Sequence, residues 1–132
     1  MPTVPALVRT SAVVVALGGS LGVASQVWAD PYSCDTDRPT IGLTVDGRLA
    51  AGATAYCTKS ATRSFRAEIK WSKAFAPDPL TGSYTDYGRT LYDASFAKCD
   101  HRNTRAYYAR AYFTSRPDDQ HDSHHRVLTV NC

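Results

Sequence analysis

The chain has 132 residues, of which 43% are hydrophobic and 20% are charged, and its formal net charge at pH 7 is +3. A chain of this length should form one folded domain. The mild positive charge needs no acidic partner to explain it. The sequence also lacks the dense basic stripe of a nucleic-acid-binding protein, so we expect no nucleic-acid partner.

Residues 1–29 predict a secretory signal peptide. Arg9 lies in a short polar start, and residues 12–23 form an apolar run rich in Val, Ala, Leu and Gly. That run is well short of the roughly 20 residues that cross a bilayer, so we expect no membrane span once the leader is removed. Residues 27–29, Val-Trp-Ala, fit the positions that a signal peptidase reads, which places cleavage before Asp30. An uncleaved anchor is the alternative interpretation of the same run.

Residues 30–132 should then be a single secreted, extracellular domain with a net charge of +2, because the leader carries one basic residue and no acidic one. This part contains all the cysteines of the chain: Cys34, Cys57, Cys99 and Cys132. An even number of cysteines in a small exported chain predicts a disulfide framework. Zinc is the competing interpretation, but no C-x-x-C pair occurs and the spacing of the cysteines suits no common zinc site.

The first part of this domain predicts a β-hairpin. Residues 40–45 alternate, with Ile41, Leu43 and Val45 on one side. The dipeptide Asp-Gly at 46–47 is a strong hairpin signal, so residues 49–57 should return as a second strand.

Residues 64–71 show the clearest alternation in the chain. One row is apolar and should face the core: Phe65, Ala67, Ile69 and Trp71. The other row is charged and should face water: Arg66, Glu68 and Lys70.

Residues 72–82 predict a loop, because Pro77 and Pro79 lack backbone donors and Gly82 can close the turn. The part from 73 to 82 is long and stiffened by proline, and it could insert into a protease cleft as an inhibitor loop, since rigid segments bind with a smaller ordering cost. The simpler interpretation, which we favour, is a connection between the two sheets.

Residues 83–96 should hold one or two weaker strands around Gly88, with Leu91 and Phe96 as candidate core residues. A turn over residues 99–103 should follow.

Residues 104–114 predict the central strand of an antiparallel sheet, because the run is rich in tyrosine and has no Gly or Pro. One row is uncharged and should face the core: Tyr107, Ala109, Ala111 and Phe113. The other row carries Arg110 between Tyr108 and Tyr112, and a charge is rarely buried without a partner, so this row should face solvent. A polar loop over 115–125 and a last strand over 126–132 complete the domain.

The predicted hairpins set the pairing of the cysteines. Cys34 precedes the first strand and Cys57 ends the second, while Cys99 and Cys132 flank the last two strands. We therefore predict the bridges Cys34–Cys57 and Cys99–Cys132, whose members should lie within the short Cα separation that a bridge requires. Each bridge should stabilise the domain by about 3–4 kcal/mol.

Six or seven short antiparallel strands in about 100 residues predict an all-β fold, a two-sheet β-sandwich stabilised by disulfides. Cys57 at the end of a second strand, Trp71 further on and the tyrosine-rich late strand resemble the immunoglobulin-like sandwich. More narrowly, the chain resembles small secreted actinobacterial proteins with an immunoglobulin-like domain. The chain departs from that family at Ala109, where an immunoglobulin domain would carry its second cysteine.

In an immunoglobulin-like sandwich, the strands 65–71 and 104–114 would be neighbours with their outward rows side by side. Tyrosine and arginine are the side chains most enriched where proteins bind partners. We therefore expect a non-enzymatic recognition domain, monomeric, whose partner is an extracellular protein or a cell-envelope ligand. The expected binding residues are the following: Arg66, Lys70, Tyr108, Arg110 and Tyr112. The alternative for this row is that tyrosines shield an ordinary sheet face while arginine stacks on them.

Two other interpretations remain. A small secreted ribonuclease could use Glu68, the single Glu of the domain, with a histidine and an arginine, although nothing in the sequence brings a histidine to it. The segment 118–125 concentrates three histidines, including His121, with three carboxylates, which can bind a divalent transition metal. It reads better as a solvated polar loop, since no rigid spacing fixes ligand geometry, and we expect neither a tightly bound metal nor a cofactor.

Overall fold

The computed structural model describes residues 33–132, which contain eleven β-strands. The strands are β1 (Cys34–Thr36), β2 (Thr40–Leu43), β3 (Leu49–Gly52), β4 (Thr54–Cys57), β5 (Arg63–Trp71), β6 (Leu80–Gly88), β7 (Leu91–Asp93), β8 (Phe96–Lys98), β9 (Thr104–Phe113), β10 (His121–Asp122) and β11 (Arg126–Thr129). Over this range there is no helix, and hence none that could cross a membrane. The expected signal peptide and its cleavage site lie outside the described residues.

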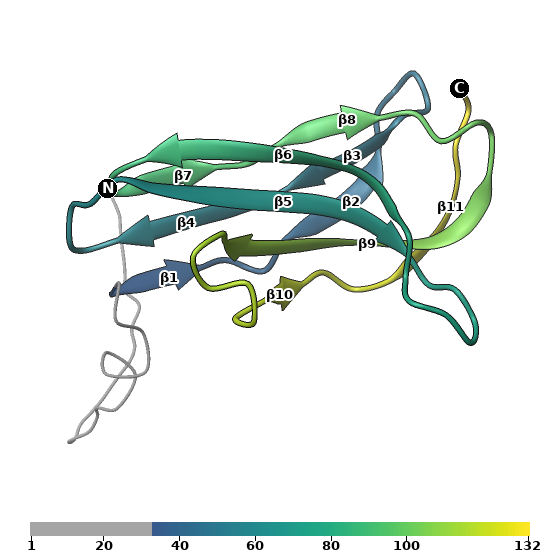
Figure 1. The fold of residues 1–132 in the computed structure, drawn as a ribbon. Coiled ribbons are helices and arrows are strands. Elements are labelled where there is room, and N and C mark those ends of the chain that lie inside the picture. Colours follow the sequence, from purple (N-terminus) through teal and green to yellow (C-terminus); the bar gives the residue numbers. More distant parts are fainter. Residues whose placement is uncertain (1–32) are drawn as a thin grey trace, which may run out of the picture. The chain divides into compact units, whose positions relative to one another are not determined.

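The strands form two layers. The first layer consists of two short sheets, with the orders β1-β4-β7 and β2-β3-β8. They continue one another, because only Ala53 separates β3 from β4 and the Ala94 amide donates to the Ala53 carbonyl at 2.8 Å. The second layer has the order β10-β9-β5-β6, and β11 also pairs with β9 (Figure 1). The predicted antiparallel β-sandwich is confirmed.

The core lies between the inward rows of the two layers. All seven of the following predicted core residues are buried: Phe65, Ala67, Ile69, Tyr107, Ala109, Ala111 and Phe113. Phe65 and Phe113 form an aromatic cluster with Tyr92 of β7, with ring centroids 4.9–6.1 Å apart. At the other end of the core, Ile69 and Tyr107 of the second layer pack in one cluster with Leu49 of the first.

Trp71 differs from its prediction as a core residue, because it is only half-buried. It packs against the core cluster with one side. The guanidinium of Arg105 lies 4.0 Å from the centroid of its ring. Trp71 therefore closes the end of the core rather than filling it.

The candidate core position Leu91 is wrong, because its side chain is exposed; Leu43 and Val45, which were predicted to share one side with Ile41, are exposed as well. Strand β2 ends at Leu43, so the alternation that buries Ile41 does not continue into the turn. The chain bends between β6 and β7, which reverses the alternation and buries Tyr92 in place of Leu91. Phe96 is half-buried at the margin of the core.

The predicted hairpin turn at Asp46-Gly47 is confirmed between β2 and β3. The Thr44 amide donates to the Arg48 carbonyl at 2.8 Å. Gly47 has a φ of 83° and lies against Asn131, whose amide donates to the Gly47 carbonyl at 2.8 Å. A side chain at position 47 would meet both a strained backbone and Asn131.

The loop predicted over residues 72–82 is shorter in the structure, because β6 begins at Leu80. Leu80 stands opposite Lys70 and Gly82 stands opposite Ile69, with a register shift between the two pairs. The ladder ends at Leu80, and beyond it the Trp71 amide donates to the Pro79 carbonyl at 3.3 Å. The polar loop predicted over 115–125 likewise contains the short strand β10, paired with β9.

The predicted bridge Cys99–Cys132 is confirmed, with its Cα atoms 5.6 Å apart. It joins the residue after β8 in the first layer to the chain that follows β11 in the second. Cys34 and Cys57 are also disulfide-bonded, and no cysteine of residues 33–132 is free. Because the chain has four cysteines and two are joined to each other, the pairing Cys34–Cys57 follows.

The predicted turn over residues 99–103 carries the chain from the first layer to the second. The Asn103 amide donates to the Asp100 carbonyl at 3.1 Å, and the two residues between them, His101 and Arg102, both have positive φ. Backbone angles of this sign at both central positions define a type I′ turn, which usually contains Asn or Gly. The Asp100 carboxylate is buried and accepts from Tyr107 Oη at 2.5 Å. Burial, and then this hydrogen bond, raise the pKa of Tyr107 well above its usual range.

Candidate functional site

The outward rows of β5 and β9 lie side by side, as the sequence predicted. Three pairs of residues stand opposite one another: Arg66 with Tyr112, Glu68 with Arg110, and Lys70 with Tyr108. The adjacent strands add Thr85 and Tyr87 from β6 and Asp122 from β10 to the same side of the sheet. We call this surface the outer face and define it by these residues: Ser64, Arg66, Glu68, Lys70, Ser83, Thr85, Tyr87, Tyr108, Arg110, Tyr112 and Asp122.

Glu68 lies at the centre of the outer face and connects its two long strands. The Arg66 Nε donates to Glu68 Oε2 at 2.9 Å, and Tyr112 Oη donates to the same oxygen at 2.9 Å. This hydrogen bond to Glu68 raises the pKa of Arg66. Burial, with the same carboxylate as a second cause, raises the pKa of Tyr112. Glu68 itself is 9% exposed, so the predicted orientation toward water is correct in direction but the side chain is largely covered.

Arg110 is held in a two-point ion pair. Its Nε donates to Asp122 Oδ1 at 2.8 Å and its Nη2 donates to Asp122 Oδ2 at 3.0 Å. This contact raises the pKa of Arg110. The sequence placed Arg110 on the outer face but did not identify Asp122 as its partner.

Tyr108 is the predicted site residue that the structure does not leave open. It is 2% exposed, which corrects the expectation that it faces solvent. Its hydroxyl donates to Asp78 Oδ2 at 2.7 Å, and the ring of His125 lies over it with the centroids 4.3 Å apart. Burial, and then the bond to Asp78, raise the pKa of Tyr108 well above its usual range. The expectation failed because Asp78 and His125 both come from loops outside the predicted strands.

Charges on the outer face nearly cancel. Two cations are bonded to carboxylates, as Arg66–Glu68 and Arg110–Asp122. Lys70 is half-buried, and its charge helps to lower the pKa of Asp78, although the hydrogen bond from Tyr108 is the main cause. The face therefore presents three cations and three carboxylates, counting Asp78 at its margin.

Tyr87 is the most exposed aromatic residue on the outer face, and it is not among the binding residues expected from the sequence. It stands opposite Ser64 on β5 and is 75% exposed. Tyr112 lies on the other side of β5, two residues along the strands. With usual strand spacings, the Cα atoms of these two tyrosines are about 12 Å apart. Alternation within 80–88 was the signal that could have identified Tyr87.

The histidines of segment 118–125 point to three different partners. His121 lies 3.8 Å from Asp119, His125 stacks on Tyr108, and Nε2 of His124 accepts from Arg38 Nη1 at 2.7 Å. The buried Ser123 fixes the segment, because its hydroxyl accepts from the Ala109 amide at 2.8 Å. Within residues 33–132, no three His, Cys, Asp or Glu side chains are grouped as metal ligands would be.

Glu68 has no histidine partner in the described part of the chain, since its bonds go to Arg66 and Tyr112. A general base must reach the proton that it removes, and this carboxylate is held by two donors. The geometry therefore gives no support to the ribonuclease alternative.

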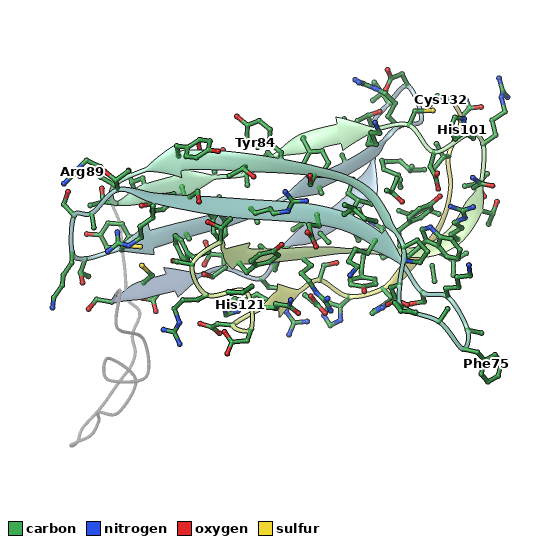
Figure 2. The ribbon with its side chains drawn as sticks, viewed as in Figure 1. Phe75, Tyr84, Arg89, His101, His121 and Cys132 are labelled. Atoms are coloured by element: carbon green, nitrogen blue, oxygen red, sulfur yellow. A yellow bond between two sulfur atoms is a disulfide. The ribbon has the colours of Figure 1, made fainter. Side chains whose placement is uncertain are left out.

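The loop over residues 72–79 ends in an exposed aromatic side chain. Figure 2 shows Phe75 at the tip of the loop, pointing away from the strands. Phe75 is fully exposed and has a φ of 61°. The base of the loop is braced by Asp78, whose Oδ1 accepts from the Lys73 amide at 3.0 Å. A left-handed residue at the tip makes a sharp turn, whereas a substrate-like inhibitor loop needs an extended backbone.

No protein-family model matches the sequence, and no curated protein matches it. Among solved structures, the chain is similar to part of DesR, a β-glucosidase from Streptomyces venezuelae whose crystal structure is in complex with D-glucose. The alignment has 14% identity and a TM-score of 0.42, and it covers 74% of this chain and 15% of that one. A likeness at this level carries no argument about fold or function.

Proposed function

We propose that the domain is a secreted, non-enzymatic recognition module that binds its ligand through the outer face. One observation carries the proposal. Arg66, Arg110 and Tyr112, which come from distant parts of the sequence, share one sheet face and are held there by Glu68 and Asp122.

Fixed side chains favour binding because they have little rotamer freedom left to lose. Ordering a long side chain at an interface costs about 0.5–1.5 kcal/mol. The Arg66 and Arg110 side chains are already held by ion pairs with Glu68 and Asp122. A ligand would meet a surface whose hydrogen-bonding groups are already in place.

Export is the second part of the proposal. Its supports are the leader-like sequence of residues 1–29 and the disulfide-bonded state of all four cysteines, which is typical of oxidising compartments. N-terminal sequencing of protein recovered from the culture medium should begin at Asp30. Recovery of the intact chain in the membrane fraction would contradict this part.

We also propose that the sandwich belongs to the immunoglobulin-like group. β5 and β9 are neighbours, and Tyr107 bonds back to Asp100 at the corner before β9, much as the corner tyrosine of that group bonds upstream. The departure concerns the strand that follows β5. In this chain that strand is β6, which pairs with β5 in the second layer, whereas the corresponding strand D of a constant-type immunoglobulin domain lies in the other sheet. The group assignment therefore rests on the pairing of β5 with β9 and on the bond from Tyr107 to Asp100.

The binding proposal is tested with paired variants. The double variant Arg66→Ala with Arg110→Ala should lose the extracellular interaction of the purified protein while keeping its fold by circular dichroism. Arg48→Ala is the matched control, because Arg48 is an exposed arginine paired with a carboxylate two residues away, outside the outer face. An interaction that survives the double variant contradicts the proposal. So does cleavage of RNA that Glu68→Gln abolishes.

A further inference from the structure

We propose that the ligand of the outer face is a neutral polysaccharide, an inference that rests on the proposed function. The first reason is the balance of charge. Arg66 and Arg110 are already neutralised by Glu68 and Asp122, and Lys70 lies in the field of Asp78. A polyanion binds by pairing its charges with free cations, and this face offers too few of them.

The second reason is the kind of groups that the face presents. The hydroxyls of Ser64, Ser83 and Thr85 share it with the paired guanidinium and carboxylate groups. The hydroxyls can donate and accept hydrogen bonds, the guanidinium groups donate and the carboxylates accept. A sugar polymer carries hydroxyls that both donate and accept along its whole length. Hydrogen bonds that involve a charged partner are stronger than those between neutral groups.

The third reason is the placement of the tyrosines. Tyr87 is 75% exposed at one side of β5 and the half-buried Tyr112 lies at the other, about 12 Å away between Cα atoms. A tyrosine ring offers a flat apolar surface with a polar tip. The C–H faces of a pyranose ring can stack on such surfaces while its hydroxyls reach the polar groups between them.

A protein partner fits the face less well. The centres of protein interfaces are depleted in Glu, Asp and Lys, although Arg is enriched there, whereas the centre of this face is the carboxylate of Glu68. The fully exposed apolar side chains that would suit such a partner lie elsewhere, with Val45 in the β2–β3 turn and Phe75 in the loop before β6. A protein partner that covered the two ion pairs would remove them from water, which costs free energy. A hydrated polymer can leave these ion pairs in contact with water and with its own hydroxyl groups.

The inference is tested by retention of the purified protein on insoluble cellulose, chitin and β-1,3-glucan, with alginate and heparin as anionic probes. We expect retention on at least one neutral polymer, and we expect it to be unchanged between about 0.05 and 0.5 M NaCl. Salt over this range screens exposed charges, so retention that depended on charge pairing would fall. Retention on none of the neutral polymers overturns the inference. Retention on the anionic probes alone, lost as salt rises, overturns it as well.

Variants of Tyr87 then locate the site. Tyr87→Ala should weaken retention about fivefold to tenfold, while Tyr87→Phe, which keeps the ring, should retain most of it. Tyr56→Ala is the matched control, because Tyr56 is 50% exposed on β4 in the first layer. Equal losses for Tyr87→Ala and Tyr56→Ala would place the polymer elsewhere and overturn the inference.

The outcome also separates this inference from the proposed function. A photo-crosslinker at Thr85 that captures a protein, with capture lost in Arg110→Ala and no retention on any neutral polymer, overturns the polysaccharide ligand while the binding face stands. Retention on a neutral polymer that is unchanged in Tyr87→Ala and in the Arg66→Ala, Arg110→Ala double variant contradicts both.

Discussion

The inner and outer faces of the paired strands β5 and β9 are built by alternate residues of the same two segments, yet different forces hold them. On the inner face, Phe65 stands opposite Phe113 and Ala67 opposite Ala111, all buried and apolar. On the outer face, Glu68 stands opposite Arg110 and both are occupied in hydrogen bonds. Burial of apolar surface stabilises the fold, whereas partly exposed ion pairs add little to it. Substitutions on the outer face should therefore cost little stability, whereas substitutions on the inner face should cost much more.

Alkaline titration should give the largest effect and test both faces together. Burial raises the pKa of Tyr107 on the inner face and of Tyr108 and Tyr112 on the outer face. A raised pKa in the folded state means that the folded protein holds these protons more tightly than the unfolded chain. The stability is then complete below about pH 10, the usual tyrosine value, and falls as pH rises above it. The tyrosinate absorbance of the buried tyrosines should appear together with the loss of the far-UV circular dichroism signal, and ionisation of all the tyrosines with the fold intact would contradict this.

Phe65→Ala should have the next largest effect, because it opens a cavity in the aromatic cluster with Tyr92 and Phe113. We expect the free energy of unfolding in urea to fall by about 3–5 kcal/mol. Arg66→Ala, one residue along the strand and on the outer face, is the control and should cost about 1 kcal/mol or less. Similar losses for the two would remove the distinction between the faces.

Tyr107→Phe should cost about 1–3 kcal/mol, because it leaves the buried Asp100 carboxylate with one donor fewer. Tyr112→Phe removes a hydroxyl bonded to a carboxylate on the outer face and should cost less, since Tyr112 is half-buried whereas Tyr107 is fully buried. Urea denaturation of the two variants gives the comparison. A larger loss for Tyr112→Phe would show that the outer network, not the corner at Asp100, holds β9.

Arg110→Ala should have the smallest effect, about 0.2–1 kcal/mol, because its ion pair with Asp122 is partly exposed. Asp122→Asn should lower the stability by a similar amount. The double variant Arg110→Ala, Asp122→Asn should lose no more than the larger single loss plus a few tenths of a kcal/mol, because both changes remove the same ion pair. The coupling between the two should shrink as salt is added. A salt-independent coupling would mean that the pair is effectively buried.

The strands β5 and β9 could be predicted from the sequence because each has a strict alternation over seven residues or more, which one buried face imposes. Alternation assigned Arg66, Lys70, Arg110 and Tyr112 to outward rows, and the resemblance to the immunoglobulin-like sandwich implied that the two rows share one surface. Alternation failed at Leu91, where a bend between strands reverses the pattern and no sequence signal marks the reversal.

The covering of Tyr108 could not be predicted, because it depends on contacts between segments distant in sequence. Asp78 lies 30 residues before Tyr108 and reaches it only once the loop has folded back. His125 reaches it only because Ser123 fixes its segment against β9. Alternation assigns a side to a residue, but it does not say what else will lie on that side.

The tip of the loop at Phe75 gives the domain a place where the backbone can be opened without undoing the fold. The strands on either side, β5 and β6, are paired with each other from the pair Arg63–Gly88 to the pair Lys70–Leu80. The hydrogen bond from the Lys73 amide to Asp78 closes the base of the loop below the tip. Exposed loop tips tolerate inserted segments and admit proteases. A peptide inserted after Phe75 would be displayed at one end of the sandwich, and a chain nicked there would stay assembled, with its two parts joined by the sheet.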